Sequence, residues 1–316
     1  MRLSSVLASI TLALLLFQPA LAEPARPEPP VSWKYPPEMP GSRVEVYRKV
    51  GDVELKAWIF EPKDDAASSK PRAAVVFFFG GGWRGGTPGQ FLPQCQYLAQ
   101  RGMVALTVDY RVKSRHDVAP QECLRDAKAA VRWVRANATR LNIDPNRIAA
   151  GGGSAGGHLA AATALVPGFE DDAASKVSSV PNALLLFNPA VALAAVEGHP
   201  DLLPQEKLDD IRERADGRPQ EISPLHFVRA QLPPCIIFHG TADEAVPFPT
   251  VELFQKQMQA AGNRCELKAY PDQPHGFFNP GRGKGAAREQ ASEHYYRTIE
   301  QLDEFLVSIG YLTVKK

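Results

Sequence analysis

Residues 148–158 read Ile-Ala-Ala-Gly-Gly-Gly-Ser-Ala-Gly-Gly-His, and this stretch decides which fold the chain adopts. An apolar segment leads into glycines, and a segment rich in alanine follows Ser154, which indicates a buried strand, a sharp turn and a helix. Residues 152–156 fit the pattern G-x-S-x-G, in which such a turn lifts a serine side chain out of the sheet. Residues 151–156 also fit G-x-G-x-x-G, the pattern of a dinucleotide-binding turn, so two interpretations are open.

The dinucleotide interpretation is the weaker one at both places where the pattern occurs. A second match, Gly80 to Gly85, carries Trp83 and Arg84, whereas a turn that holds a diphosphate needs small residues. After residues 151–156, the next predicted strand and its end (residues 183–189) contain no acidic residue to bind a ribose. The sequence therefore favours a nucleophilic serine, and no cofactor is predicted.

A serine reacts at neutral pH only with a base, and the base needs an orienting acid. After a G-x-S-x-G serine the expected order along the chain is Asp or Glu, then His. Asp243 follows the apolar run 235–238, and the adjacent Glu244 is the alternative acid. Of the two later histidines, His275 lies in a loop after the last predicted strand, whereas His294 lies within the predicted final helix. The predicted catalytic residues are Ser154, Asp243 and His275.

The turn at Gly80-Gly81-Gly82 has a predicted role in the same reaction. Acyl transfer places negative charge on one oxygen atom, and fixed N–H groups stabilise that charge. We predict that the backbone N–H groups of Gly81, Gly82 and Ala155 form this oxyanion hole. Trp83 is predicted to line the substrate pocket, with a loop-anchoring core residue as the alternative.

The rest of the chain alternates apolar runs with helical patterns, which indicates a mostly parallel sheet covered by helices on both faces. Residues 44–50 and 53–60 are joined by Gly51-Asp52 and predict an antiparallel start. Residues 190–232 are charged and irregular, and we interpret them as a small insertion. We therefore expect one domain over residues 43–316.

The first 22 residues have the features of an export signal. Arg2 precedes the apolar run 6–17, and Ala20-Leu21-Ala22 fits a signal peptidase site. Cleavage there would leave a proline-rich leader at residues 23–42 and no membrane anchor, with an uncleaved anchor as the alternative. We expect a secreted or periplasmic protein.

Composition argues against nucleic acid as a partner, but it does not decide whether the cysteines form disulfides. The 36 Lys and Arg residues against 35 Asp and Glu residues leave a net charge of +1, too little to hold nucleic acid. Export permits disulfides, and we favour one bridge between Cys95 and Cys123, with free thiols as the alternative. No C-x-x-C pair is present among the four cysteines, so no metal site is predicted.

Taken together, five segments resemble the α/β-hydrolase superfamily, in its esterase/lipase branch related to hormone-sensitive lipase and to bacterial feruloyl and acetyl-xylan esterases. They are Phe-Gly-Gly-Gly-Trp at 79–83, Asp-Tyr-Arg at 109–111, Gly-Gly-Ser-Ala-Gly-Gly-His at 152–158, His-Gly-Thr-Ala-Asp at 239–243 and Pro-His-Gly-Phe at 274–277. The resemblance implies an eight-stranded, mostly parallel sheet, a Ser-Asp/Glu-His triad and no cofactor. Phe79 departs from the family pattern, in which a histidine usually begins the oxyanion turn and supports the loop.

We therefore expect a secreted serine carboxylic-ester hydrolase that removes an acetyl or other acyl group through an acyl-enzyme. The expected substrate is a short-chain ester or a carbohydrate ester, either a small molecule or a polysaccharide. Two alternatives are a serine peptidase or amidase of the prolyl-oligopeptidase-like type and a non-catalytic binding module on a hydrolase scaffold. The oligomeric state stays open.

Overall fold

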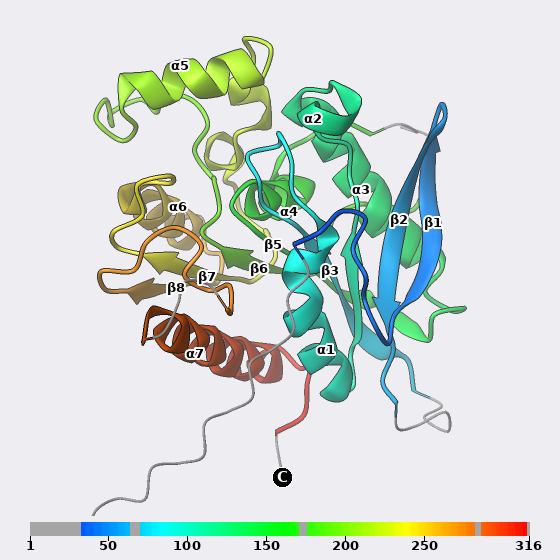
Figure 1. The fold of residues 1–316 in the computed structure, drawn as a ribbon. Helices are drawn as coiled ribbons and strands as arrows, with labels where there is room; N and C mark the ends of the chain where they lie inside the picture. The colour runs from blue at the N-terminus through cyan, green and yellow to red at the C-terminus, as the bar shows by residue number, and fades with distance from the viewer. Residues whose placement is uncertain (1–32, 64–69, 171–175, 282–285, 315–316) are drawn as a thin grey trace, which may run out of the picture.

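The computed structural model describes residues 33–63, 70–170, 176–281 and 286–314 (Figure 1). The predicted signal peptide (1–22) and residues 23–32 of the predicted leader lie outside the described residues. Among the described residues, no helix is both long and apolar enough to cross a membrane.

An eight-stranded sheet forms the centre of the molecule, with the order β1-β2-β4-β3-β5-β6-β7-β8. Its strands are β1 (Arg43–Val50), β2 (Val53–Phe60), β3 (Arg72–Phe78), β4 (Val104–Val108), β5 (Ile143–Gly153), β6 (Ala183–Phe187), β7 (Cys235–Gly240) and β8 (Cys265–Tyr270). β2 pairs antiparallel with β1 and with β4, and all the other neighbours are parallel. The predicted mostly parallel sheet with an antiparallel start is therefore confirmed.

Helices cover both faces of this sheet and bury two apolar cores (Figure 1). The helices of the described residues are η1 (Pro88–Phe91), α1 (Leu92–Gln100), α2 (Lys113–His116), α3 (Pro120–Ala136), α4 (Ala155–Leu165), α5 (Gln205–Arg214), η2 (Pro219–Ile222), η3 (Pro224–Phe227), α6 (Phe248–Ala260) and α7 (Ala286–Ser308). The core under α1 and α7 lies on one face, and the core under α3, α4 and α6 lies on the other. Because both faces are covered, the central strands are continuous apolar runs.

The two cores overturn the favoured disulfide. Cys95 belongs to the core under α1, and Cys123 belongs to the core under α3. The sheet lies between them, so their sulfur atoms cannot come within bonding distance. Both residues are buried free thiols, as are Cys235 and Cys265.

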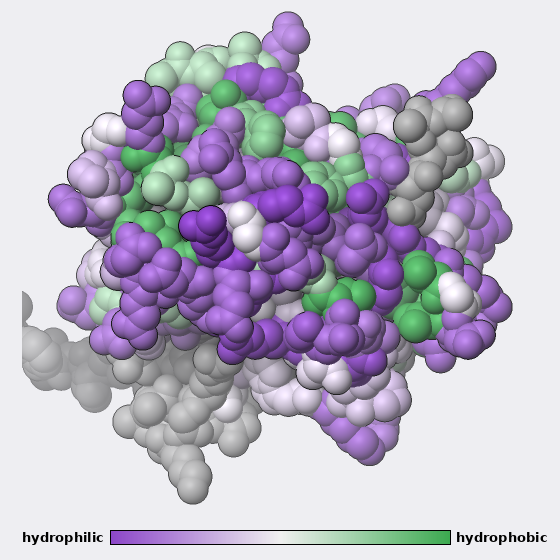
Figure 2. All heavy atoms as spheres, turned by 90° about the horizontal axis from the view of Figure 1, so that it is seen from above, coloured by the Kyte–Doolittle hydropathy of each residue, from purple (hydrophilic) through white to green (hydrophobic). Residues whose placement is uncertain are grey.

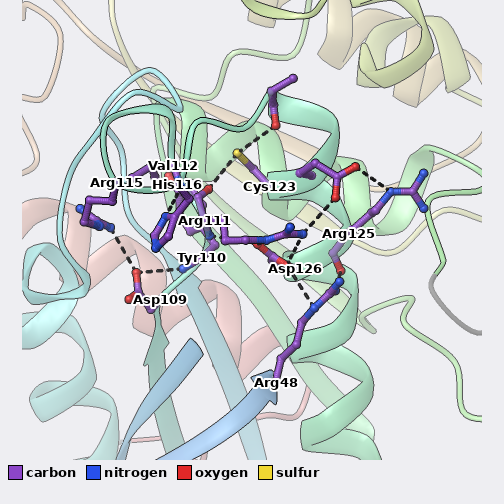
Figure 3. Close-up of polar contacts among 12 residues, drawn as sticks. Arg48, Asp109, Tyr110, Arg111, Val112, Arg115, His116, Cys123, Arg125 and Asp126 are labelled. Atoms are coloured by element: carbon purple, nitrogen blue, oxygen red, sulfur yellow. Dashed lines mark hydrogen bonds and ion pairs between the residues drawn. The ribbon is translucent and has the colours of Figure 1, made fainter. Parts of the chain in front are cut away.

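A buried ion-pair network holds the connection between β4 and α3 (Figure 3). The Arg111 guanidinium donates to both carboxylate oxygens of Asp126, from Nε at 2.9 Å and from Nη2 at 3.0 Å. Arg48 lies 3.2 Å from the same carboxylate, whose side chain has no exposed surface. This network fixes the segment that follows β4, where Tyr110 lies directly before Arg111.

Replacing Asp126 with leucine should therefore lower the free energy of unfolding by about 3–5 kcal/mol, because the buried Arg111 loses its bidentate partner and the partly buried Arg48 loses an ion pair. Urea titration followed by tryptophan fluorescence measures this. Asp117→Asn is the matched control, since Asp117 pairs with Lys113 at the surface, where such a pair contributes below about 1 kcal/mol. Equal losses in the two variants would contradict a structural role for the network.

Candidate active site

Ser154 stands on a strained turn between β5 and α4. Its backbone has φ 55° and ψ −119°, a combination that non-glycine residues avoid. The turn is fixed by the Ser154 N–H, which donates to the Phe187 carbonyl of β6 at 2.8 Å. Such strain is characteristic of functional sites, and here it directs the serine side chain toward a cavity.

The glycines on either side of Ser154 are needed for close backbone contact. A Cβ atom at Gly156 would lie 2.0 Å from the Phe78 carbonyl oxygen, and one at Gly152 would lie 2.4 Å from the Gly156 backbone. Helix α4 therefore begins directly against the end of β3. This contact brings Ser154 beside the glycine turn that follows β3.

Asp243 and His275 form a hydrogen-bonded pair at the ends of β7 and β8. His275 Nδ1 lies 2.7 Å from Asp243 Oδ2, which also accepts from Asn188 Nδ2 at 2.9 Å. The other oxygen, Oδ1, accepts from the backbone N–H groups of Ala245 and Val246 at 2.9 and 2.8 Å. The carboxylate is thus held by four donors and has one orientation.

These contacts determine the charge of Asp243. Burial acts to raise its pKa, but the hydrogen bond and charge of His275 and the Val246 N–H outweigh burial, so the pKa lies below its ordinary value. The carboxylate is therefore ionised at neutral pH. It favours the His275 tautomer with the proton on Nδ1, which leaves Nε2 as an acceptor.

A cavity of about 540 Å³ brings the candidate residues together. Ser154 and His275 both line it, and so do Gly81, Gly82, Trp83 and Ala155, while Asp243 lies behind His275. Within the described chain, Ser154 Oγ makes no hydrogen bond to His275, a bond that often tightens only when substrate is bound. The residues that sequence spacing predicted as one site thus surround one space.

The oxyanion turn has free donors and firm support. Among the described residues, the N–H groups of Gly81, Gly82 and Ala155 have no protein acceptor. The preceding residue, Phe79, stacks on Tyr110 with ring centroids 4.1 Å apart, and its carbonyl accepts from the Tyr110 hydroxyl at 2.7 Å. An aromatic stack and a backbone hydrogen bond therefore support the turn at the position where the family pattern has a histidine.

Comparison with known families identifies the chain at this point. Residues 59–258 match the BD-FAE family, which is most of the described chain. The chain belongs to the BD-FAE family. Residues 219–306 also match the dienelactone hydrolase family. Both matches agree with an α/β-hydrolase fold and with the esterase/lipase branch that the motifs predicted.

Individual relatives of this BD-FAE family member are esterases. A probable carboxylic ester hydrolase, LipM of Mycobacterium tuberculosis, is 29% identical over 228 residues, covering 68% of this chain and 51% of LipM. An acetylxylan esterase of Xylanibacter ruminicola is 29% identical over 57% of this chain and 36% of that enzyme. The chain thus spans about half or less of the length of these curated relatives.

The matches to solved structures have higher sequence identity and cover more of both chains. Thermogutta terrifontis esterase 2 with butyrate bound is 51% identical, covers 90% of this chain and 100% of that one, and has a TM-score of 0.81. The same esterase phosphonylated by sarin is 52% identical, covers 89% and 100%, and has a TM-score of 0.82. The BD-FAE chain therefore has the fold of an esterase, and the comparisons support ester hydrolysis as its class of reaction.

Trp83 combines the two roles that the sequence left open in this BD-FAE family member. It lines the cavity, and its indole Nε1 donates to His158 Nδ1 at 3.2 Å. His158 Nε2 in turn donates to the Ile222 carbonyl of the insertion at 2.7 Å. Burial lowers the pKa of His158 to about 4, so the ring is neutral and acts as a fixed link between the oxyanion turn, α4 and the insertion.

Helix α5, within the predicted insertion, forms part of the cavity lining. Lys207, Asp210, Ile211 and Arg214 line the cavity and share one helical face, with spacings of three and four residues. Figure 2 looks down on this end of the molecule and shows a mostly hydrophilic surface with small hydrophobic patches. The charge of the run from Glu206 to Arg218 indicated a solvated helix in the insertion, and such insertions often cap a pocket, but no motif indicated which of its residues border the cavity.

Sequence reasoning also missed three amide side chains, Gln90, Asn188 and Asn279. Gln90 and Asn279 line the cavity, and Asn188 contacts Asp243. None belongs to a motif that carries chemistry. Asn188 directly follows β6 and Gln90 lies in η1, whereas Asn279 lies in the loop between β8 and α7, close to the predicted His275.

Proposed function

We propose that the chain is a serine carboxylic-ester hydrolase in which Ser154 is the nucleophile, His275 the base and Asp243 the orienting acid. One observation carries the proposal: His275, oriented by its 2.7 Å hydrogen bond to Asp243, lines the same cavity as the strained Ser154. Beside that serine lie the backbone N–H groups of Gly81, Gly82 and Ala155, which have no acceptor within the part of the chain that the structure describes. A nucleophile, a base with a fixed tautomer and an oxyanion hole are what acyl transfer requires.

In this mechanism Ser154 Oγ attacks the ester carbonyl while His275 Nε2 takes its proton. The N–H groups of Gly81, Gly82 and Ala155 stabilise the negative oxygen of the tetrahedral intermediate. His275 then protonates the leaving alcohol, and an acyl-enzyme remains. Water, deprotonated by His275, attacks the acyl group and releases the acid.

The two sides of the cavity favour a short acyl group on a polar alcohol. Ala155, Ala190 and Phe278 give part of the lining a small or apolar character, whereas Lys207, Asp210 and Arg214 of α5 contribute charged side chains. The propionate-bound and butyrate-bound Thermogutta terrifontis structures and the acetylxylan esterase relative agree with this class. We therefore propose a short-chain or acetylated carbohydrate ester as substrate, cleaved outside the cytoplasm if residues 1–22 act as an export signal.

The p-nitrophenyl ester series from acetate to octanoate tests this proposal. We expect kcat/KM to be highest for acetate to butyrate and at least about tenfold lower for octanoate, because an acyl chain longer than the apolar lining must contact charged groups. Release of acetate from acetylated xylan tests the carbohydrate class. An organophosphonate should inactivate the enzyme, as sarin phosphonylates the relative.

Three outcomes would count against this proposal. Hydrolysis of p-nitroacetanilide at a rate near that of p-nitrophenyl acetate would favour the amidase alternative. A rate that rises steadily from acetate to octanoate would contradict the short acyl site. Binding of acetylated xylan without release of acetate would favour the non-catalytic module.

A further inference from the structure

A chain of buried side-chain amides runs between the oxyanion turn and the loop that carries His275. The Gly80 N–H donates to Gln90 Oε1 at 2.6 Å, and Gln90 Nε2 donates to Asn279 Oδ1 at 2.9 Å. Asn279 Nδ2 then donates to the Gly276 carbonyl at 2.8 Å. Three hydrogen bonds thus join a residue of the oxyanion turn to the residue next to His275.

The same loop residue is held from the other side as well. The Gly276 N–H donates to Asn188 Oδ1 at 3.1 Å, and Asn188 Nδ2 donates to Asp243 Oδ2 at 2.9 Å. Both backbone groups of Gly276 are therefore bound by amide side chains. Its φ of 79° lies in the region that favours glycine, so the loop adopts this conformation without the strain of a Cβ atom.

The direction of every bond in this chain is determined by its ends. Because the Gly80 N–H can only donate, Gln90 must present its oxygen there and its NH₂ group to Asn279. Asn279 must then present its NH₂ group to the Gly276 carbonyl, which can only accept. A single arrangement satisfies all the groups, and each amide is at least nine-tenths buried, so breaking one bond leaves unpaired polar groups.

We propose that Gln90 and Asn279 are positioning residues that hold the oxyanion turn and His275 in register across the cavity. This inference rests on the proposed function. Gly80 uses its N–H to bind Gln90, which leaves the next two N–H groups, those of Gly81 and Gly82, for the oxyanion. The two loops come from distant parts of the chain, and a misplacement of about 1 Å between reacting groups can lower a rate about a hundredfold.

The test measures kcat and KM per active site in Gln90→Met, Asn279→Leu and the double variant. Titration with an organophosphonate counts functional sites, so a loss of folded protein does not count as a loss of rate. We expect kcat to fall about 10- to 100-fold in each single variant with KM changed less than about threefold. The double variant should be no slower than the slower single variant, because both changes break one chain.

A matched control is Gln94→Leu in α1. Gln94 is fully buried, and neither atom of its amide has a hydrogen-bond partner among the described residues. It is outside the amide chain, so we expect its kcat to match that of the unmodified protein. A similar fall in Gln94→Leu and Asn279→Leu would show general sensitivity to buried amides and would overturn the proposal.

Asn279→Asp gives a readout that a purely structural role would not produce. The new carboxyl group can donate to the Gly276 carbonyl only when protonated, and burial raises the pKa of an acid. We expect its kcat, relative to the unmodified protein, to rise as the pH falls from 8 to 6. If the unmodified protein cleaves esters but kcat is unchanged in all the variants, the positioning role is wrong; if the unmodified protein cleaves no ester, the proposed function itself fails.

Discussion

Ser154→Ala should lower kcat for p-nitrophenyl butyrate by about 10⁶-fold, the size of effect expected when a nucleophile of this kind is removed. The oxyanion N–H groups and the cavity remain, so a small residual rate above that of water is expected. Binding should change little, because the hydroxyl group contributes to the reaction rather than to the shape of the site. The measurement compares the initial rate of purified Ser154→Ala with the rates of the unmodified enzyme before and after treatment with an organophosphonate.

Ser154→Gly is the companion variant, because it separates the chemistry from the backbone strain. Both variants lack the hydroxyl group and should be equally inactive. Glycine adopts φ 55° and ψ −119° without a Cβ penalty, so Ser154→Gly should unfold at a higher urea concentration than Ser154→Ala. Activity in either variant above about a hundredth of the original would rule out Ser154 as the nucleophile.

The sequence predicts most of this fold because the strands have strong local signals. The apolar runs 73–79 and 104–110 contain most or all of the buried strands β3 and β4, and the pattern of 151–156 gives a sharp turn before α4. The position of β4 between β2 and β3 in the sheet could not be predicted, because the local periodicity of a strand does not indicate its neighbours. The helical pattern of residues 120–141 continues beyond Ala136, where α3 ends, and β5 begins at Ile143, before the apolar segment that starts at Ile148.

The candidate site also contains residues that the sequence predicts and residues that it does not. Ser154, Asp243 and His275 could be predicted, because each lies in a short motif with a known chemical reason. Gln90 and Asn279 could not, because an amide acquires a role only when the fold brings a matching donor and acceptor to it, and these two are 189 residues apart. The same limit explains the disulfide error, since spacing does not reveal on which face of the sheet a cysteine lies.

Asp243→Asn should lower kcat by about 10⁴-fold while preserving the fold. The substituted amide has one oxygen, whereas Asp243 accepts from Ala245, Val246, Asn188 and His275 through two. If its NH₂ group faces His275, it donates to Nδ1 and places the imidazole proton on Nε2. His275 then has no lone pair to accept the proton of Ser154.

This variant also tests the charge of the carboxylate. The pKa of Asp243 is lower in the folded protein than in the unfolded chain, because His275 and the Val246 N–H stabilise the charged form more than burial opposes it. Asp243 therefore stabilises the fold above the ordinary pKa of aspartate, about 4, and this contribution disappears as the pH falls through the lower folded pKa. The free energies of unfolding of the original and variant proteins should differ at pH 7 and converge in acid.

Glu244→Gln is the matched control, since Glu244 is the adjacent carboxylate, is exposed and was the alternative acid. We expect less than about a twofold change in kcat, because a solvated side chain next to the triad neither orients His275 nor pairs with it. The hydrogen bond from His275 to Asp243 selects between the two carboxylates on geometry alone. Activity that survives Asp243→Asn but is lost in Glu244→Gln would transfer the orienting role one residue along the chain.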